Sequence, residues 1–228
     1  MKNKNVSLTQ PDELPVIPLW IGGHAYLTIT EAFATVWRAS DAEPLRRVPL
    51  CSTHEVGTAL RSAREALLLW STLPMTTRLQ FLAEVGKTLS DHASHFAGLI
   101  QEETNIPLPE AEAEVAMAID CLHDRHTAND GLNAAPEAIA LPPTAGTIAI
   151  ACGTRPHPLS GFLRLAAPAW QAGHVVIARA SADAPSTLFA LAELTARCHW
   201  PAGTFCLLYG DATTDAALKA ENCPVEQA

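Results

Sequence analysis

The feature that most constrains this fold is an alternation of apolar runs and helical patterns in the second half of the chain. Each of three short apolar runs is followed by a helical pattern before the next run begins. The runs are 147–151, 175–179 and 204–209, and the helical patterns are 160–172, 186–198 and 212–220. Strands that alternate with helices form a parallel sheet whose faces are covered by the crossover helices. Because such crossovers are right-handed, the order predicts an α/β fold: a Rossmann-like parallel sheet with helices on both faces.

The first half of the chain is mainly helical. β-prone residues around a Gly-Gly pair predict one or two short strands between residues 16 and 37. Ser52 and Glu55 fit a capping box, in which a hydroxyl and a carboxylate each accept from a free amide at a helix start. Apolar residues then recur at helical spacing to about Trp70. Because further helical patterns follow, an N-terminal helical layer is expected before the sheet. These patterns cover about 74–89, 92–104 and 110–122.

Composition divides the chain into four segments. Residues 1–14 are polar and are expected to form a flexible N-terminus, and 127–145 are rich in Asn, Gly, Ala and Pro, which predicts a linker. The N-terminal strand and helical layer fill 15–126, and a Rossmann-like βαβαβ half-sheet fills 146–228. We expect 15–228 to form one structural unit.

The composition also argues against several classes of function. Apolar residues make up 48% and the net charge is −9, so the chain is globular and has no excess of cations for nucleic acid or an anionic membrane. The six cysteines are scattered without a C-x-x-C pair, which argues against a disulfide framework. We identify no signal peptide, and no apolar run approaches the roughly 18 residues of a membrane span. These features predict a cytoplasmic protein.

Ligands of a sheet of this kind bind beyond the carboxyl ends of its strands. That rule brings together the segments 152–157, 179–181 and 210–212. Arg179 lies among them and could donate to ribose or phosphate oxygens, which favours a nucleotide site. The alternative stays open, because neither glycine-rich phosphate-binding motif is present and such segments are also ordinary loop ends of an α/β fold.

Histidines offer little evidence of a metal site. Cys121, His123 and His126 would need a further ligand close by, so a polar helix end is the preferred interpretation. His92 and His95 repeat the spacing and are interpreted in the same way.

His157 is the best single candidate for a general base, because it stands between two prolines at the mouth of the expected crevice. No acid or nucleophile is adjacent to it in the sequence, so no catalytic residue is assigned. The glutamates of the helical layer are expected to be solvated helix faces. They are Glu102, Glu103, Glu110, Glu112 and Glu114.

Several stretches in collinear order resemble the N-terminal half of the aldehyde dehydrogenase superfamily, over about residues 16–220. They are RRVPLCSTHEVGTALRSAREALLLWSTLPMTTRLQFLAEVGKTL (46–89), EAEAEVAMAIDCL (110–122), GTIAIACGTRPHPL (146–159), LAAPAWQAGHVVIARAS (165–181) and WPAGTFCLLYGD (200–211). The resemblance implies an NAD(P)-binding domain, a catalytic domain and a bridging hairpin used in oligomerisation. It also implies that a cysteine thiolate attacks the aldehyde, hydride passes to the nicotinamide, and water activated by a glutamate releases the acid.

The resemblance implies a site for NAD or NADP, although in degenerate form. Arg179 replaces the family's lysine and keeps a positive charge for the adenosine ribose, whereas Ala182 loses the acid that would grip the ribose hydroxyls. Ala212 and Asp215 stand where glycines are expected near the pyrophosphate, and a carboxylate there would repel phosphate. The candidate cofactor-binding residues are Ile150, Ala151, Cys152, Arg179, Ser181 and Gly210.

Other departures concern catalysis. The turn 153–158 is longer than the family's and has no asparagine for the oxyanion hole, and loss of one such donor costs about 10²–10³ in rate. The sequence stops at Ala228, before the expected nucleophile, and no cysteine occupies the nucleophile's context. The segment 127–145 is too short for the usual bridging hairpin.

These observations leave three hypotheses. In the first, the chain is a non-catalytic accessory module that packs on a protein partner, either in a homo-oligomer or on a full-length homologue. In the second, it is the NAD(P)-binding portion of an aldehyde-oxidising enzyme that a second chain completes. In the third, it is a gene fragment without function.

Overall fold

The computed structural model describes residues 14–30, 32–123, 146–151, 157–180, 182–221 and 223–227. The predicted linker 127–145 therefore lies outside the described residues. No helix in the described part of the chain is long and apolar enough to cross a membrane.

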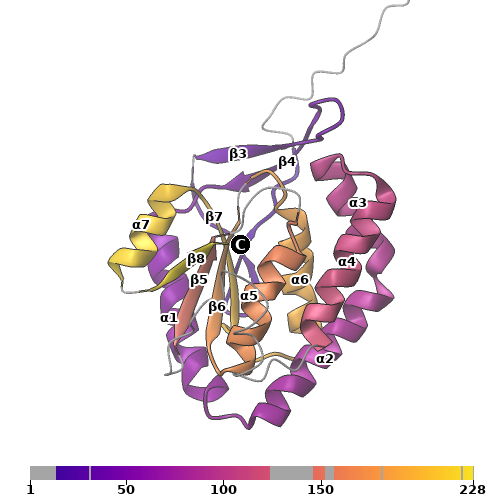
Figure 1. Cartoon of the computed structure of the whole chain (residues 1–228). Helices are drawn as coiled ribbons and strands as arrows, with labels where there is room; N and C mark the ends of the chain where they lie inside the picture. Colours follow the sequence, from indigo (N-terminus) through magenta and orange to yellow (C-terminus); the bar gives the residue numbers. More distant parts are fainter. Residues whose placement is uncertain are drawn as a thin grey trace, which may run out of the picture.

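A parallel sheet lies at the centre of the molecule, as the alternation of apolar runs predicts (Figure 1). Its strands are β5 (Thr147–Ala151), β6 (Val175–Ala180), β7 (Phe205–Tyr209) and β8 (Val225–Gln227). They are arranged in the order β7-β6-β5-β8, so the chain starts in the middle, adds two strands on one side and then crosses to the other. The order in which strands are added therefore reverses between β5 and β8, although the strands stay parallel. Proteins of this α/β class bind their ligands at such a switch point.

The N-terminal segment extends this sheet. β1 (Leu19–Ile21) and β2 (His24–Tyr26) form a hairpin, and β1 pairs antiparallel with β7. Gly22 and Gly23 link the two strands with φ values of 66° and 78°, a left-handed conformation that glycine adopts without strain. The predicted turn is thus confirmed, and the main sheet has six strands in the order β2-β1-β7-β6-β5-β8.

A second, two-stranded sheet consists of β3 (Phe33–Trp37) and β4 (Pro44–Pro49). The segment 16–37 thus holds three strands rather than one or two, and β4 and β8 lie outside every strand that the sequence predicts. β8 spans only three residues, too few to show a period-2 pattern. In β4 two arginines interrupt the apolar alternation, and a proline stands at each end of the strand.

The helices build three layers around the sheet (Figure 1). One face is covered by α1 (Thr53–Trp70) and α7 (Ala212–Ala220), and the other by α5 (Ser160–Gln171) and α6 (Ser186–Arg197). The remaining helices pack outside α5 and α6 and do not cover the sheet directly. They are α2 (Met75–Asp91), α3 (Ala93–Thr104) and α4 (Leu108–His123).

The capping box predicted at the start of α1 is confirmed. The Ser52 hydroxyl accepts from the amide of His54 at 3.2 Å, and Glu55 accepts from the amide of Ser52 at 2.9 Å. Pro74 directly precedes α2, where its missing N–H costs no helical hydrogen bond.

An aromatic cluster closes the amino end of the parallel strands. Trp170 packs edge-on against Trp200, with ring centroids 4.9 Å apart, and Trp200 stacks on Trp70 at 5.2 Å. The indole of Trp70 donates to the carbonyl of Trp170, and the indole of Trp170 donates to that of Thr204. These two buried N–H groups are therefore satisfied. Phe81 adds to the cluster from α2, so this end joins α1, α2, α5 and the start of β7.

Candidate functional site

The carboxyl end of the sheet is polar, and its most connected group is the carboxylate of Glu114. This side chain is 2% exposed and comes from α4, yet it lies at the first turn of α5. It accepts from the amides of Leu159 at 3.0 Å and Ser160 at 2.7 Å, and from the Ser160 hydroxyl at 2.6 Å. Glu114 therefore satisfies the free amides at this helix start, where an anionic ligand would otherwise bind.

Glu114 also holds His157. Its Oε2 lies 2.8 Å from Nδ1 of the imidazole, whose side chain is 54% exposed. The sequence offers no acid beside His157, and the structure supplies one from 43 residues earlier in the chain. A carboxylate on Nδ1 fixes the orientation of the ring and leaves Nε2 as the atom available to solvent. Ser160, the described hydroxyl on this carboxylate, donates to Glu114 rather than to the imidazole and so does not form a nucleophile–base pair with His157.

A second buried carboxylate occupies the start of α6. Glu103, from α3, accepts from both the amide and the hydroxyl of Ser186. Arg46 of β4 donates to it at 3.2 Å, which ties the small sheet to this position. Burial raises the pKa of Glu103 to about 7, against the opposing effect of the Ser186 and Arg46 donors.

These two contacts correct the prediction that the five glutamates are solvated helix faces. The prediction is wrong for Glu103 and Glu114, which are buried, whereas Glu110 and Glu112 are exposed and Glu102 is half-buried. The physical reason is that the first turns of α5 and α6 need acceptors, and the helices α3 and α4 pass beside them. A signal was present, because both glutamates fall on the apolar stripe of their own helix.

Arg179, the predicted cofactor-binding cation, is bound within the chain. Its Nε lies 2.7 Å from Oδ1 of Asp215 and its Nη2 lies 2.9 Å from Oδ2, so the two groups form a bidentate pair. The two side chains are only 12% and 13% exposed. Arg179 also donates to the carbonyl of Gly210 at 3.4 Å. The guanidinium face that would receive ribose or phosphate oxygens is therefore occupied by a carboxylate from α7.

The structure places three of the other candidate cofactor-binding residues at the carboxyl end of the sheet. Ile150 and Ala151 end β5 beside β8, at the reversal of the sheet, and the Ile150 side chain is fully buried. Gly210 follows β7, and a Cβ there would lie 1.9 Å from the Thr214 hydroxyl oxygen, so glycine allows α7 to approach the strand. Cys152 and Ser181 lie outside the described residues.

Cys51 and Cys206 do not have the character of a catalytic thiolate. Burial raises the pKa of Cys51 to about 12 and that of Cys206 to about 11, so both remain thiols at neutral pH. Cys198 and Cys223 are buried in the core.

The described residues include no group of three or more His, Cys, Asp or Glu that could hold a metal ion. His123 ends α4 and lies close to Gly86 of α2, while His126 lies outside the described part.

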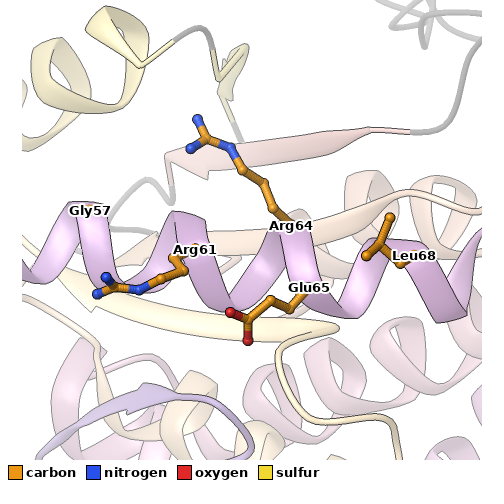
Figure 2. Close-up of a pocket in the computed structure, with 5 residues that line it drawn as sticks. All are labelled: Gly57, Arg61, Arg64, Glu65 and Leu68. Carbon is orange, nitrogen blue, oxygen red and sulfur yellow. The ribbon is translucent and has the colours of Figure 1, made fainter.

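A shallow, open depression lies elsewhere, on the outer face of α1 (Figure 2). Its lining residues all come from this one helix: Gly57, Arg61, Arg64, Glu65 and Leu68. It contains none of the candidate cofactor-binding residues.

Comparison with known sequences identifies the family. The model of the aldehyde dehydrogenase family matches residues 28–223. The chain is 30% identical to the N-succinylglutamate 5-semialdehyde dehydrogenase of Ectopseudomonas mendocina over 214 residues, covering 83% of this chain and 42% of that protein. It is 26% identical to a betaine aldehyde dehydrogenase of Vibrio vulnificus over 209 residues, covering 88% of this chain and 43% of the relative. The chain thus spans a little under half the length of these relatives.

Solved structures agree on the fold. Lactaldehyde dehydrogenase from Escherichia coli superposes with a TM-score of 0.80 at 22% identity, covering 94% of this chain and 47% of that structure. A putative methylmalonate-semialdehyde dehydrogenase from Sinorhizobium meliloti, solved with NAD, gives 0.82 at 17% identity, covering 94% and 45%. The ordered sequence match and the shared α/β architecture together show that this chain belongs to the aldehyde dehydrogenase family.

Proposed function

We propose that this chain is a non-catalytic member of the aldehyde dehydrogenase family that acts in the cytoplasm as an accessory module on a protein partner. In this proposal the cofactor site is degenerate, and the carboxyl end of the sheet does not bind NAD or NADP. The observation that carries the proposal is the bidentate pair between Arg179 and Asp215, because it occupies the guanidinium that would otherwise donate to the ribose or phosphate oxygens of the cofactor.

Two further observations support the same conclusion. The first turns of α5 and α6 are occupied by Glu114 and Glu103, so neither offers its amides to a phosphate. The high pKa values of Cys51 and Cys206 also make either thiol a poor nucleophile for an aldehyde.

Calorimetric titration of the chain with NAD⁺ and with NADP⁺ tests the proposal. No saturable heat is expected up to millimolar cofactor. Saturable binding by the unmodified chain would overturn the proposal.

The Asp215→Asn variant tests the cause. It removes the counter-charge of Arg179 and keeps the size of the side chain, so weak dinucleotide binding is expected to appear. Adding Arg179→Ala to that variant should abolish the binding, because the freed guanidinium is then absent. If binding in Asp215→Asn survives the loss of Arg179, the pair is not what closes the site.

The second candidate function is the NAD(P)-binding portion of an aldehyde-oxidising oxidoreductase that a second chain completes. The sheet favours it, because β5 and β8 form the strand reversal at which α/β proteins bind nucleotides. The same titration separates the two functions: saturable binding that Arg179→Ala weakens would favour the second candidate.

A further inference from the structure

The outer face of α1 carries an unusual stripe of side chains (Figure 2). Gly57, Arg61, Arg64 and Leu68 follow one another at spacings of four, three and four residues, and Glu65 lies beside them. This is the spacing of a seam along which one helix packs against another. In the described part of the chain the stripe faces outward, since the opposite side of α1 covers the sheet.

The stripe has apolar ends that are exposed to solvent. Leu68 is 76% exposed and Leu69 is 53% exposed, although every other apolar residue of the second half of α1 is buried or half-buried. At the other end of the stripe, a Cβ built on Gly57 would meet nothing within 4 Å. A helical glycine is less stable than alanine by about 1 kcal/mol, and no contact with the described residues explains its presence.

The charges of the stripe complement a second copy of themselves. Arg61 and Glu65 form no ion pair within the described residues, and Arg61 donates only to the Thr58 hydroxyl, at 3.3 Å. Arg64 is engaged differently, by the Glu221 carbonyl at 3.2 Å and its carboxylate at 3.7 Å. One unpaired cation and one unpaired anion, a turn apart on one helix face, are what an antiparallel copy of that face can satisfy twice.

We propose that this face of α1 is an isologous docking surface for a second copy of this chain. With the two helices antiparallel about a two-fold axis near residue 63, Arg61 lies opposite the partner's Glu65, and Glu65 lies opposite the partner's Arg61. Leu68 and Leu69 then cover Thr58 and Gly57 of the other copy, where the missing side chain of the glycine lets the helices approach closely. The inference rests on the proposed function, because it names the partner of the accessory module.

The contact area follows from the geometry. The stripe covers about three turns of one helix, so the interface lies at the small end of specific interfaces and its dimer is expected to depend on concentration. Sedimentation velocity across a wide range of protein concentrations should show a shift from monomer to dimer mass. A monomer at every concentration would overturn the proposal.

Charge reversal provides the decisive test. Arg61→Glu and Glu65→Arg each place like charges opposite one another, so each variant alone should remain monomeric. An equimolar mixture of the two should form a heterodimer, because the first variant then presents two acids to the two arginines of the second. Failure of the mixture to associate, or dimers of either variant alone, would contradict the proposed geometry.

A pair of glycine substitutions provides the matched control. Gly57→Leu fills space that is empty in this chain but would clash with a second copy, so dimer formation should be lost. Gly98→Leu, on α3, also meets nothing within 4 Å and should leave the dimer unchanged. Circular dichroism confirms that the variants fold.

The outcome is separate from that of the cofactor titration. A chain that binds no NAD⁺ and stays monomeric would contradict this docking surface alone. A dimer that binds NAD⁺ would contradict the proposed function, with its degenerate cofactor site, and leave the docking surface standing.

Discussion

The two ends of the parallel sheet are built from different chemistry. At the amino end, aromatic rings from four parts of the chain pack together, and Trp70 and Trp170 donate their indole protons to main-chain carbonyls. At the carboxyl end, two carboxylates from the outer helices cap the starts of α5 and α6, and a third pairs with Arg179. The first end is closed by apolar packing and the second by internal ion pairs and hydrogen bonds.

The difference explains why a ligand site is expected at the carboxyl end. Folds of this class bind ligands at that end because helix starts and strand ends leave polar groups to be satisfied there. In this chain Glu103, Glu114 and Asp215 supply the acceptors themselves. The end keeps the layout of a binding site while the protein's own side chains take the place of the ligand.

The largest loss of stability is expected from a substitution in the aromatic cluster at the amino end. Trp170→Ala removes a fully buried ring that contacts Trp200, Phe162 and Phe205. The resulting cavity should lower the free energy of unfolding by about 3–5 kcal/mol. Urea denaturation followed by far-UV circular dichroism measures the loss. A loss below about 1 kcal/mol would show that the aromatic cluster is not a main source of stability.

Removal of a helix cap at the carboxyl end should lower the free energy of unfolding by a smaller amount. Glu114→Ala leaves the amides of Leu159 and Ser160 without their acceptor and releases His157. The expected loss is about 2–3 kcal/mol, because hydrogen bonds to a buried charge are being removed. Glu112→Ala is the matched control on the exposed side of the same helix and should change stability by less than about 0.5 kcal/mol. Equal effects of the two substitutions would refute the capping role of Glu114.

The charge of Glu103 should make the carboxyl end sensitive to pH. Its folded-state pKa of about 7 lies above the ordinary value of 4.5, so the folded protein holds a proton that the unfolded chain releases. This contribution to stability is complete below about pH 4.5 and is lost as pH rises through 7. Glu103→Gln should therefore gain stability relative to the unmodified chain between pH 5 and 8, on the order of 1–2 kcal/mol. Melting temperatures of both proteins across that range give the difference, and a flat difference would contradict the raised pKa.

The smallest effects should come from removing one hydroxyl at each end, and they should have opposite signs. Ser160→Ala deletes a donor to Glu114 and should cost about 1 kcal/mol. The Thr204 hydroxyl at the amino end is buried and has no hydrogen-bond partner among the described residues. Thr204→Val should therefore be neutral or stabilising by about 0.5 kcal/mol. Loss of stability in both variants would mean that the two ends do not differ as described.

Much of this fold could be predicted from the sequence, because apolar periodicity reports burial. The runs at β5, β6 and β7 and the helical stripes behind them predict the sheet and its covering helices. Periodicity cannot place the helices of the first half, however, so the separation of α1 from α2, α3 and α4 onto opposite sides of the sheet was not foreseen.

The candidate site could be predicted only as a location. The rule for parallel sheets puts Arg179 and Gly210 at the carboxyl end, but the partner of Arg179 depends on how α7 packs beside α1 and β8. Glu103 and Glu114 could have been suspected, since a carboxylate on an apolar helix stripe must find donors if it is buried. Which donors it finds is a long-range contact, and no local pattern encodes it.

The caps on α5 and α6 have a consequence for how the molecule assembles. Each comes from a helix that precedes its target by tens of residues, so neither helix start is satisfied until the outer layer has docked. Sheet and outer helices should accordingly fold as one cooperative unit, with amide exchange protection at Leu159, Ser160 and Ser186 appearing only when α3 and α4 are in place. During synthesis from the N-terminus the glutamates emerge first, so the acceptors are already present when the helices that need them leave the ribosome.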